Sequence, residues 1–183
     1  TTIHDWAATY LNRHADIGTG DGRFALDLAR RSPHTAVIAI DANLDRLRGS
    51  RRRDPENLRF IAANALDEQL ASLPMVDVVT INFPYGSLLR GLVECDPALL
   101  GWLDALLAPG GRIETRVNAT ALTATGLDPS DAPAAIASTL RQIDGVGART
   151  HPLTRTSLRT FPSTWAKRLG HGRDQEAWLI VGR

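Results

Sequence analysis

Short apolar runs alternate with segments of helical periodicity along most of the chain. The apolar runs predict strands over residues 13–17, 35–40, 58–62, 76–81, 112–117 and 176–181. Amphipathic segments predict helices over residues 2–10, 22–31, 43–49, 98–107 and 134–143, and a short helix before Pro74. Residues 123–133 are polar, contain glycine and proline, and predict a loop. Strands that alternate with helices favour an α/β fold whose parallel sheet is covered on both faces.

A glycine-rich turn follows the first predicted strand. Residues 16–23 read Asp-Ile-Gly-Thr-Gly-Asp-Gly-Arg and lead into a helix. Glycine allows positive φ and lets a ligand approach the backbone closely, and the helix start offers unpaired N–H groups. The spacing Gly-x-Gly-x-Gly differs from the Gly-x-Gly-x-x-Gly of dinucleotide-binding turns. Asp21 lies inside the turn, where its carboxylate repels a pyrophosphate and suits a cationic ligand.

A second carboxylate, Asp41, ends the next predicted strand about 20 residues later, where Rossmann-like folds place a ribose-binding acid. S-adenosylmethionine combines a sulfonium, an amino group and a ribose diol, so the two acids together indicate this cofactor. Ligands of open α/β sheets bind beyond the carboxyl ends of the strands, where the loops after the first four strands meet. The predicted cofactor-binding residues in these loops are Asp16, Gly18, Thr19, Gly20, Asp21, Gly22, Asp41, Ala42, Asn64, Ala65 and Asn82.

The loop Asn82-Phe83-Pro84-Tyr85 follows the fourth strand and should face the transferred methyl group. Its last three residues offer flat apolar surface to a planar ring, and a base stacked on an aromatic side chain gains about 1–3 kcal/mol. The stretch also resembles the Asn-Pro-Pro-Tyr element of methyltransferases that act on exocyclic amines of bases. Methylation of an exocyclic amine, on a base or a small molecule, with Asn82 as hydrogen-bond acceptor, is therefore an alternative.

A second aromatic residue, Trp165, is followed closely by Lys167, Arg168 and Arg173. A tryptophan flanked by cations suits a stacking platform for a base with phosphate contacts beside it. The same pattern is typical of a core tryptophan on an amphipathic helix that also buries Leu169, and taken alone the sequence leaves both interpretations open.

Composition and charge limit the ligands and kinds of site that the chain can have. The net charge of +1 is too small to indicate nucleic-acid binding by itself, but Lys167 is the only lysine, so the positive charge is almost entirely arginine, which suits phosphate recognition. The basic linker Arg51, Arg52 and Arg53 contacts phosphates or forms a solvated helix end. A single cysteine excludes an internal disulfide and a multi-cysteine zinc site, no metal site is expected, and the absence of a long apolar run predicts no membrane role.

Three motifs in combination resemble a known family. They are Asp-Ile-Gly-Thr-Gly-Asp-Gly at 16–22, Phe-Pro-Tyr-Gly-Ser-Leu-Leu-Arg-Gly at 83–91 and Ser-Thr-Trp-Ala-Lys-Arg-Leu at 163–169. Together they resemble the aminoglycoside-resistance methyltransferases that modify N1 of the decoding-site adenine, adenine 1408, of 16S rRNA. Tyr85 stands where family members carry tryptophan. The parts before Asp16 and between the second and third strands are shorter than in the family.

The resemblance implies a Rossmann-like class I methyltransferase, with a mostly parallel seven-stranded sheet in a single domain over residues 1–183. A loop and helix insertion is expected around residues 118–145. The resemblance further implies that Tyr85 and Trp165 grip a flipped adenine, with Phe83 and Pro84 beside them as site residues.

The expected partner is 16S rRNA in the 30S subunit, and the expected enzyme is a cytoplasmic monomer that uses S-adenosylmethionine. By the same resemblance, Lys167, Arg168 and Arg173 contact rRNA phosphates. Because N1 of adenine carries a lone pair, positioning can supply most of the catalysis without a strong base. A protein that binds S-adenosylmethionine and docks on RNA without turnover is a further alternative.

Overall fold

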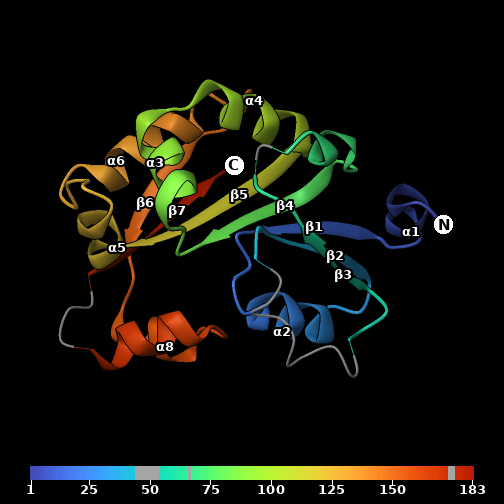
Figure 1. Ribbon diagram of the computed structural model, residues 1–183, viewed down its shortest axis with the longest axis horizontal. Coiled ribbons are helices and arrows are strands. Elements are labelled where there is room, and N and C mark those ends of the chain that lie inside the picture. The colour runs from blue at the N-terminus through green and yellow to red at the C-terminus, as the bar shows by residue number, and fades with distance from the viewer. Residues whose placement is uncertain (44–53, 66, 173–175) are drawn as a thin grey trace.

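The predicted alternation of strands and helices is present in the computed structural model, which describes residues 1–43, 54–65, 67–172 and 176–183 (Figure 1). The strands are β1 Asn12–Ile17, β2 Thr35–Asp41, β3 Leu58–Ala62, β4 Val76–Asn82, β5 Leu107–Asn118, β6 Ala148–Pro152 and β7 Ala177–Gly182. The α-helices are α1 Ile3–Ala8, α2 Arg23–Arg31, α3 Gly86–Glu94, α4 Pro97–Leu106, α5 Ala119–Ala124, α6 Ala132–Leu140, α7 Arg155–Thr160 and α8 Thr164–His171. The short helix before Pro74 is a 3-10 helix, η3 Glu68–Ser72.

The strands form one sheet in the order β3-β2-β1-β4-β5-β7-β6, seven strands within the described part of the chain. Strands β1 to β5 pair in parallel, whereas β7 runs antiparallel to both of its neighbours, β5 and β6. The expected Rossmann-like, mostly parallel sheet is therefore confirmed.

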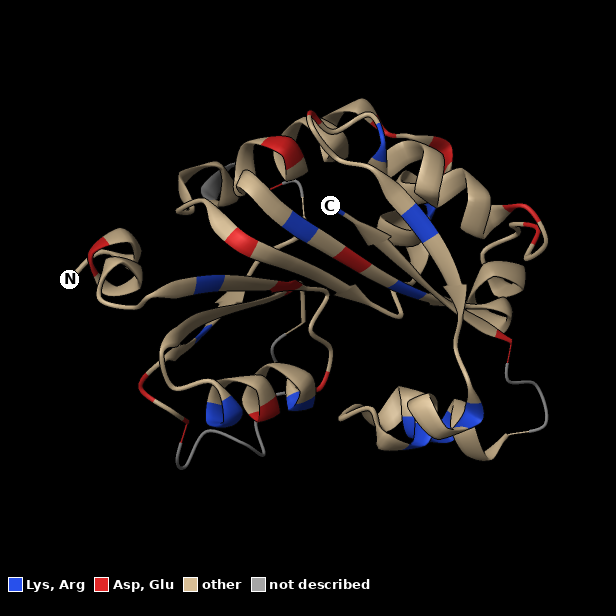
Figure 2. Cartoon of the chain, turned by 180° about the vertical axis from the view of Figure 1, so that it is seen from behind, with Lys and Arg blue, Asp and Glu red and all other residues tan. Residues whose placement is uncertain are grey.

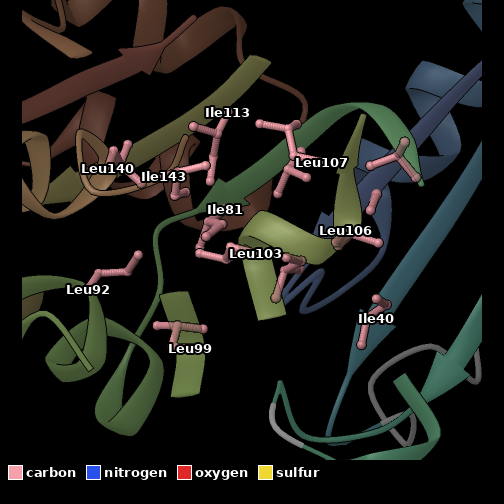
Figure 3. Close-up of a cluster of buried hydrophobic side chains, with 14 of the residues drawn as sticks. Ile40, Ile81, Leu92, Leu99, Leu103, Leu106, Leu107, Ile113, Leu140 and Ile143 are labelled. Carbon is pink, nitrogen blue, oxygen red and sulfur yellow. The ribbon is translucent and has the colours of Figure 1, made fainter. Parts of the chain in front are cut away.

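The larger core lies between the sheet and the helices α3, α4 and α6. Figure 3 shows Ile81 of β4 and Ile113 of β5 pointing toward Leu103 of α4, and all three side chains are fully buried or nearly so. The central strands read as continuous apolar runs because both faces of a parallel sheet are covered. In β2, residues 36–40 are all buried.

The opposite face of the sheet is covered by α2 and, separately, by the α7–α8 segment, as Figure 1 shows. Helix α2 uses small residues, Ala25 and Ala29, to approach Val37 and Ala39 of β2 closely. The α7–α8 segment buries only a small cluster built on Leu158 and Leu169 with Ala177 of β7.

Several local predictions differ from the structure. Helices α3, α5, α7 and α8 were not predicted as separate elements, and the predicted loop 123–133 is shortened at both ends by α5 and α6. Strand β5 begins at Leu107, directly after α4, and includes residues 109–111, where its pairing with β4 is irregular. Glycine and proline there form an irregular stretch of a strand instead of a loop. The predicted helix 43–49 lies outside the described residues except for Asn43, which is not helical.

The topology creates a place where a ligand can bind. The chain runs outward from β1 to β2 and β3 and then returns to β4 on the other side of β1. Loops that follow β1 and β4 therefore diverge and leave a crevice at the carboxyl ends of these strands. Among the described helices, none is long and apolar enough to cross a membrane. The assignment of residues 1–183 to one domain with an insertion around 118–145 stays a prediction.

Candidate active site

A cavity of about 870 Å³ opens at the carboxyl ends of β1, β2 and β4. Every predicted cofactor-binding residue except Gly22 lines it, and so do all four residues predicted to hold the acceptor base. The predicted residues in its wall are Asp16, Gly18, Thr19, Gly20, Asp21, Asp41, Ala42, Asn64, Ala65, Asn82, Phe83, Pro84, Tyr85 and Trp165. Four loops and a distant helix thus contribute to one continuous site.

The glycine turn after β1 has a backbone that only glycine adopts readily. Gly18, Gly20 and Gly22 have φ values of 69°, 59° and 69°, a region where other residues are strained. The N–H of Gly18 donates to the carbonyl of Ile40, at 2.8 Å, which ties the turn to β2. Gly22 is the N-cap of α2 and is absent from the cavity wall, and its predicted contact with the cofactor stays a prediction.

Asp41, at the end of β2, fixes the glycine turn from the side. Its Oδ2 accepts a 2.8 Å hydrogen bond from the N–H of Gly20, and its Oδ1 accepts one of the same length from the N–H of Asn43. A carboxylate has about four acceptor sites, so each oxygen keeps further capacity on the cavity side. Asp41 can therefore hold the turn and bind hydroxyl groups of a ligand at once.

Asp16 lies at the floor of the cavity in a buried polar network. Its Oδ1 accepts hydrogen bonds from Thr80 Oγ1 at 2.7 Å and from Asn82 Nδ2 at 2.9 Å, whereas Oδ2 has no partner among the described residues. Burial raises the pKa of Asp16 from 3.8 to about 6, although the polar side chains of Thr19, Thr80 and Asn82 and the positive charge of Arg116 act in the opposite direction. The free, buried oxygen suits a cationic group of a ligand.

The aromatic wall of the cavity comes from the loop between β4 and α3. Phe83 adopts a φ of 53°, a left-handed conformation that bulky residues rarely take, so the surrounding structure must hold it there. The turn leaves Tyr85 at the cavity rim with 63% of its surface exposed. Such exposure of a large aromatic side chain beside a polar pocket is typical of a stacking surface.

Trp165 faces the same cavity from helix α8. The side chain of Ser163 caps this helix by accepting from the N–H of Ala166, and Ala166 and Leu169 are its buried positions. Trp165 lies on the outer side with 43% of its surface exposed, while its indole Nε1 donates to Oδ1 of the fully buried Asn118, at 3.4 Å. The interpretation of Trp165 as a core residue is therefore wrong, and its role as a stacking platform for a base stays a prediction.

The comparisons with known proteins agree with this geometry. The family described as 16S rRNA (adenine(1408)-N(1))-methyltransferase matches residues 1–183. The chain belongs to this family. A relative of that name from Streptoalloteichus hindustanus is 27% identical over 87% of this chain and 81% of its own. The aminoglycoside resistance methyltransferase NpmB1 has 30% identity, a TM-score of 0.74 and coverage of 98% of this chain and 91% of its own.

A second solved structure shares the fold closely. The 16S rRNA methyltransferase KamB superposes with a TM-score of 0.85 over 98% of this chain and 91% of its own, at 23% identity. Membership of the adenine(1408)-N1 methyltransferase family confirms the predicted family, enzyme class and cofactor, S-adenosylmethionine. The roles of individual site residues stay predictions.

The side chains that line the cavity of this methyltransferase suit the chemical groups of S-adenosylmethionine. The unpartnered Oδ2 of Asp16 is the group that a bound ammonium would satisfy, and the carboxylate of Asp41 suits the ribose diol. Ala42, Asn64 and Ala65, after β2 and β3, line the same cavity and are the residues predicted to hold the adenine. When bound, the cofactor supplies an electrophilic methyl group on a positively charged sulfur.

Asn82, the residue on which the exocyclic-amine alternative depends, is already engaged. Its amide nitrogen donates to Asp16, and its Oδ1 accepts a 3.0 Å hydrogen bond from Arg116 Nη1. The side chain of Asn82 therefore braces the floor of the cavity instead of pointing a free oxygen at an acceptor amine. This geometry disfavours the alternative chemistry.

Sequence reasoning missed other residues that line the cavity. Phe24, Leu88, Asp96, Ser163 and Thr164 all contribute to its wall. The only sequence signal for Phe24 was its position next to the glycine turn, and the only one for Ser163 was its position close to Trp165. Leu88 was missed because α3 was not predicted, and Asp96 because its evident role is to cap α4 by accepting from the N–H groups of its first turn.

Among the predicted RNA contacts, Arg168 lines the cavity and Lys167 is exposed on α8, whereas Arg51, Arg52, Arg53 and Arg173 lie outside the described residues.

The pKa of Asp16 leads to a pH prediction for cofactor binding. A carboxylate that must be ionised to hold an ammonium loses that ability as pH falls through its pKa, here about 6. We expect the affinity for S-adenosylhomocysteine to be constant above pH 7 and to fall about tenfold per pH unit well below 6. Calorimetry between pH 5 and pH 8 measures this, with Asp16→Asn as a variant that should bind weakly at every pH. An affinity of the unmodified protein that does not change down to pH 5 would contradict the assignment.

The free energy of unfolding should depend little on pH in the range where Asp16 titrates. A raised pKa means that folded Asp16 holds a proton that the unfolded chain loses, so its contribution to stability falls as pH rises from about 4 to 6. His14 has the opposite effect, because burial lowers its pKa to about 4 and its contribution rises over a similar range. The two contributions largely cancel, and the pH effect is therefore expected in cofactor binding.

Proposed function

We propose that this protein methylates N1 of adenine 1408 of 16S rRNA within the 30S subunit and so confers aminoglycoside resistance, acting as a cytoplasmic monomer. The observation that carries the proposal is the continuity of one cavity from the glycine turn to two exposed aromatic residues, Tyr85 and Trp165. A cavity with an acid-lined cofactor end and an aromatic rim at the other end suits a methyl donor beside a flat acceptor ring.

Methyl transfer to N1 of adenine does not require the enzyme to activate the acceptor ring. Ring N1 of adenine carries a lone pair that forms the new N–C bond as the carbon–sulfur bond breaks, and no proton has to leave first. The residues of the chain therefore act by positioning: Tyr85 and Trp165 hold the flipped ring, and Asp16 and Asp41 hold the donor. The aspartates that line the cavity, Asp16, Asp21, Asp41 and Asp96, therefore do not have to act as general bases.

The RNA-binding surface is proposed on the α7–α8 segment. Residues 153–172 contain four Lys or Arg residues and no Asp or Glu, and Figure 2 shows this concentration of positive charge on one side of the molecule. Lys167 and Arg168 are exposed and follow Trp165 on the same helix. Cations beside a stacking residue suit the phosphates that flank a flipped base.

Methyl transfer from radiolabelled S-adenosylmethionine to isolated 30S subunits, followed by nucleoside mapping, tests the proposal. We expect one 1-methyladenosine at position 1408, and cells that express the protein should tolerate aminoglycosides. Methylation of an exocyclic amine would support the alternative chemistry instead. Binding of cofactor and subunits with no transferred label would support a docking protein without turnover.

RNA binding should depend strongly on salt and in part on α8. Each phosphate contact that is removed should flatten the plot of log affinity against log salt by roughly 1. We expect Lys167→Gln and Arg168→Gln to have this effect on the binding of 30S subunits. Arg149→Gln is a matched control, because Arg149 is exposed on the edge strand β6. Slopes equal to that of the control would show that the two α8 cations are ordinary surface residues.

A further inference from the structure

Phe161 joins the base-binding part of the site to the cofactor-binding part. It lies between α7 and α8, four residues before Trp165. Its ring stacks on that of Phe24 with centroids 5.1 Å apart and planes at 8°. The edge contact with Phe83 has a centroid distance of 5.9 Å and an angle of 82°. Phe24 belongs to the first turn of α2, directly after the glycine turn, and both Phe24 and Phe83 line the cavity.

A buried arginine contacts the same ring. The guanidinium carbon of Arg116 lies 4.8 Å from the centroid of Phe161, and the side chain of Arg116 is only 14% exposed. The guanidinium also donates to Asn82 Oδ1 and to Glu114 Oε2, at 3.0 Å and 3.1 Å. Because Asn82 donates in turn to Asp16, Phe161 is connected to the floor of the cofactor cavity by side chains in direct contact.

The α7–α8 segment has few other attachments to the rest of the molecule. The two helices contact each other far more than any other element, and their apolar cluster with the sheet is small. Figure 1 shows α8 and α2 on the same side of the sheet, which leaves the aromatic contacts of Phe161 between these two elements. A segment held by few contacts depends strongly on each of them.

We propose that Phe161 is a positioning residue that docks the α7–α8 segment on the cofactor half of the site. Its stack on Phe24, with Arg116 against the same ring, sets where Trp165 stands relative to the methyl donor. The ring does not have to touch either substrate to do this. The proposal rests on the proposed function for its effect on catalysis, but its structural part concerns the free protein and does not depend on the RNA target.

Hydrogen exchange of the backbone amides of residues 164–171 tests the structural part without RNA. We expect Phe161→Leu to speed exchange in α8 roughly 2- to 10-fold, the range that corresponds to the loss of one aromatic pair. Phe161→Tyr keeps the ring and should exchange like the unmodified protein. Tyr10→Leu is the matched control, because it removes a comparable aromatic contact, with Trp6, at a distance from the site.

Kinetics then separate a positioning role from general stability. We expect Phe161→Leu to lower kcat for 30S methylation roughly tenfold while the KM for S-adenosylmethionine changes less than about twofold. Phe161→Tyr should restore kcat, and a double variant with Phe24→Leu should lose no more than the larger single effect, since the two rings act as a pair. Should Phe161→Leu not fold, Phe161→Met carries the same test, because the flexible thioether side chain fills irregular gaps and still removes the ring.

The outcomes distinguish this inference from the proposed function. If α8 of Phe161→Leu exchanges as slowly as in Tyr10→Leu, the docking role is wrong, whatever the enzyme methylates. If exchange accelerates but the unmodified protein does not methylate 30S subunits, the docking role stands and the proposed function fails. The positioning role would also be wrong if Tyr10→Leu lowered kcat as much as Phe161→Leu does. The same conclusion would follow if the losses of Phe161→Leu and Phe24→Leu added up in the double variant.

Discussion

Replacing Trp165 by alanine should remove most methyl transfer and leave cofactor binding nearly intact. The side chain lines the cavity and is 43% exposed. A base stacked on an aromatic ring gains about 1–3 kcal/mol, so we expect a loss of about 5- to 150-fold in the rate of methylation of 30S subunits. Affinity for S-adenosylhomocysteine, measured by calorimetry, should change less than about twofold, because the stack acts only on the acceptor.

Variants of Tyr85 tell which part of the side chain matters. Tyr85→Ala should resemble Trp165→Ala, Tyr85→Phe should be mild because the ring does the holding, and Tyr85→Trp should retain or raise activity by widening the platform. If the hydroxyl instead orients an amine, Tyr85→Phe would be severe and Asn82→Ala worse. A severe Tyr85→Phe together with an indifferent Trp165→Ala would overturn methylation at adenine N1.

The parts of the fold that the sequence predicts well are those fixed by local chemistry. Strand β2 follows from an apolar run that parallel pairing buries on both faces, and the predicted bounds of β3 agree with the structure at both ends. The glycine turn and Asp41 could be placed together because the spacing of a strand, a turn and a helix determines which loops meet at the edge of the sheet. The residues that these loops contribute to the cavity wall were therefore predictable almost one by one, whereas their contacts with the cofactor stay predictions.

The acceptor end depended on contacts that no local pattern reports. Phe161 precedes a proline and has no sequence signal of its own, and only the tertiary structure brings its ring onto Phe24. The positive φ of Phe83 has no signal in the sequence, because it is held by the surrounding structure. Helix α3 was hidden because it begins directly after the aromatic loop, at Gly86, with no residue of the usual capping type before it.

Asp41→Ala should weaken cofactor binding by about 10- to 100-fold or more. The carboxylate holds Gly20 and Asn43 through hydrogen bonds of 2.8 Å, so its loss loosens the glycine turn as well as removing the partner of the ribose hydroxyls. Hydrogen bonds to a charged group contribute about 1.5–3 kcal/mol each. Methyl transfer at limiting S-adenosylmethionine should fall in proportion, while the rate at saturating cofactor should recover in part.

Two further variants show whether the weaker cofactor binding of Asp41→Ala comes from the lost negative charge, from the lost hydrogen-bond acceptor or from a general effect on the fold. Asp41→Asn keeps one carbonyl oxygen and should lie between alanine and the unmodified protein in affinity for S-adenosylhomocysteine. Asp128→Ala is the control, because Asp128 likewise accepts from a backbone N–H, that of Ser130 at 2.9 Å, but does not line the cavity. Calorimetry on variants with unchanged melting temperature decides the matter. Unchanged affinity in folded Asp41→Ala would show that the ribose is held elsewhere, and equal losses in Asp128→Ala would show that the effect is not local to the site.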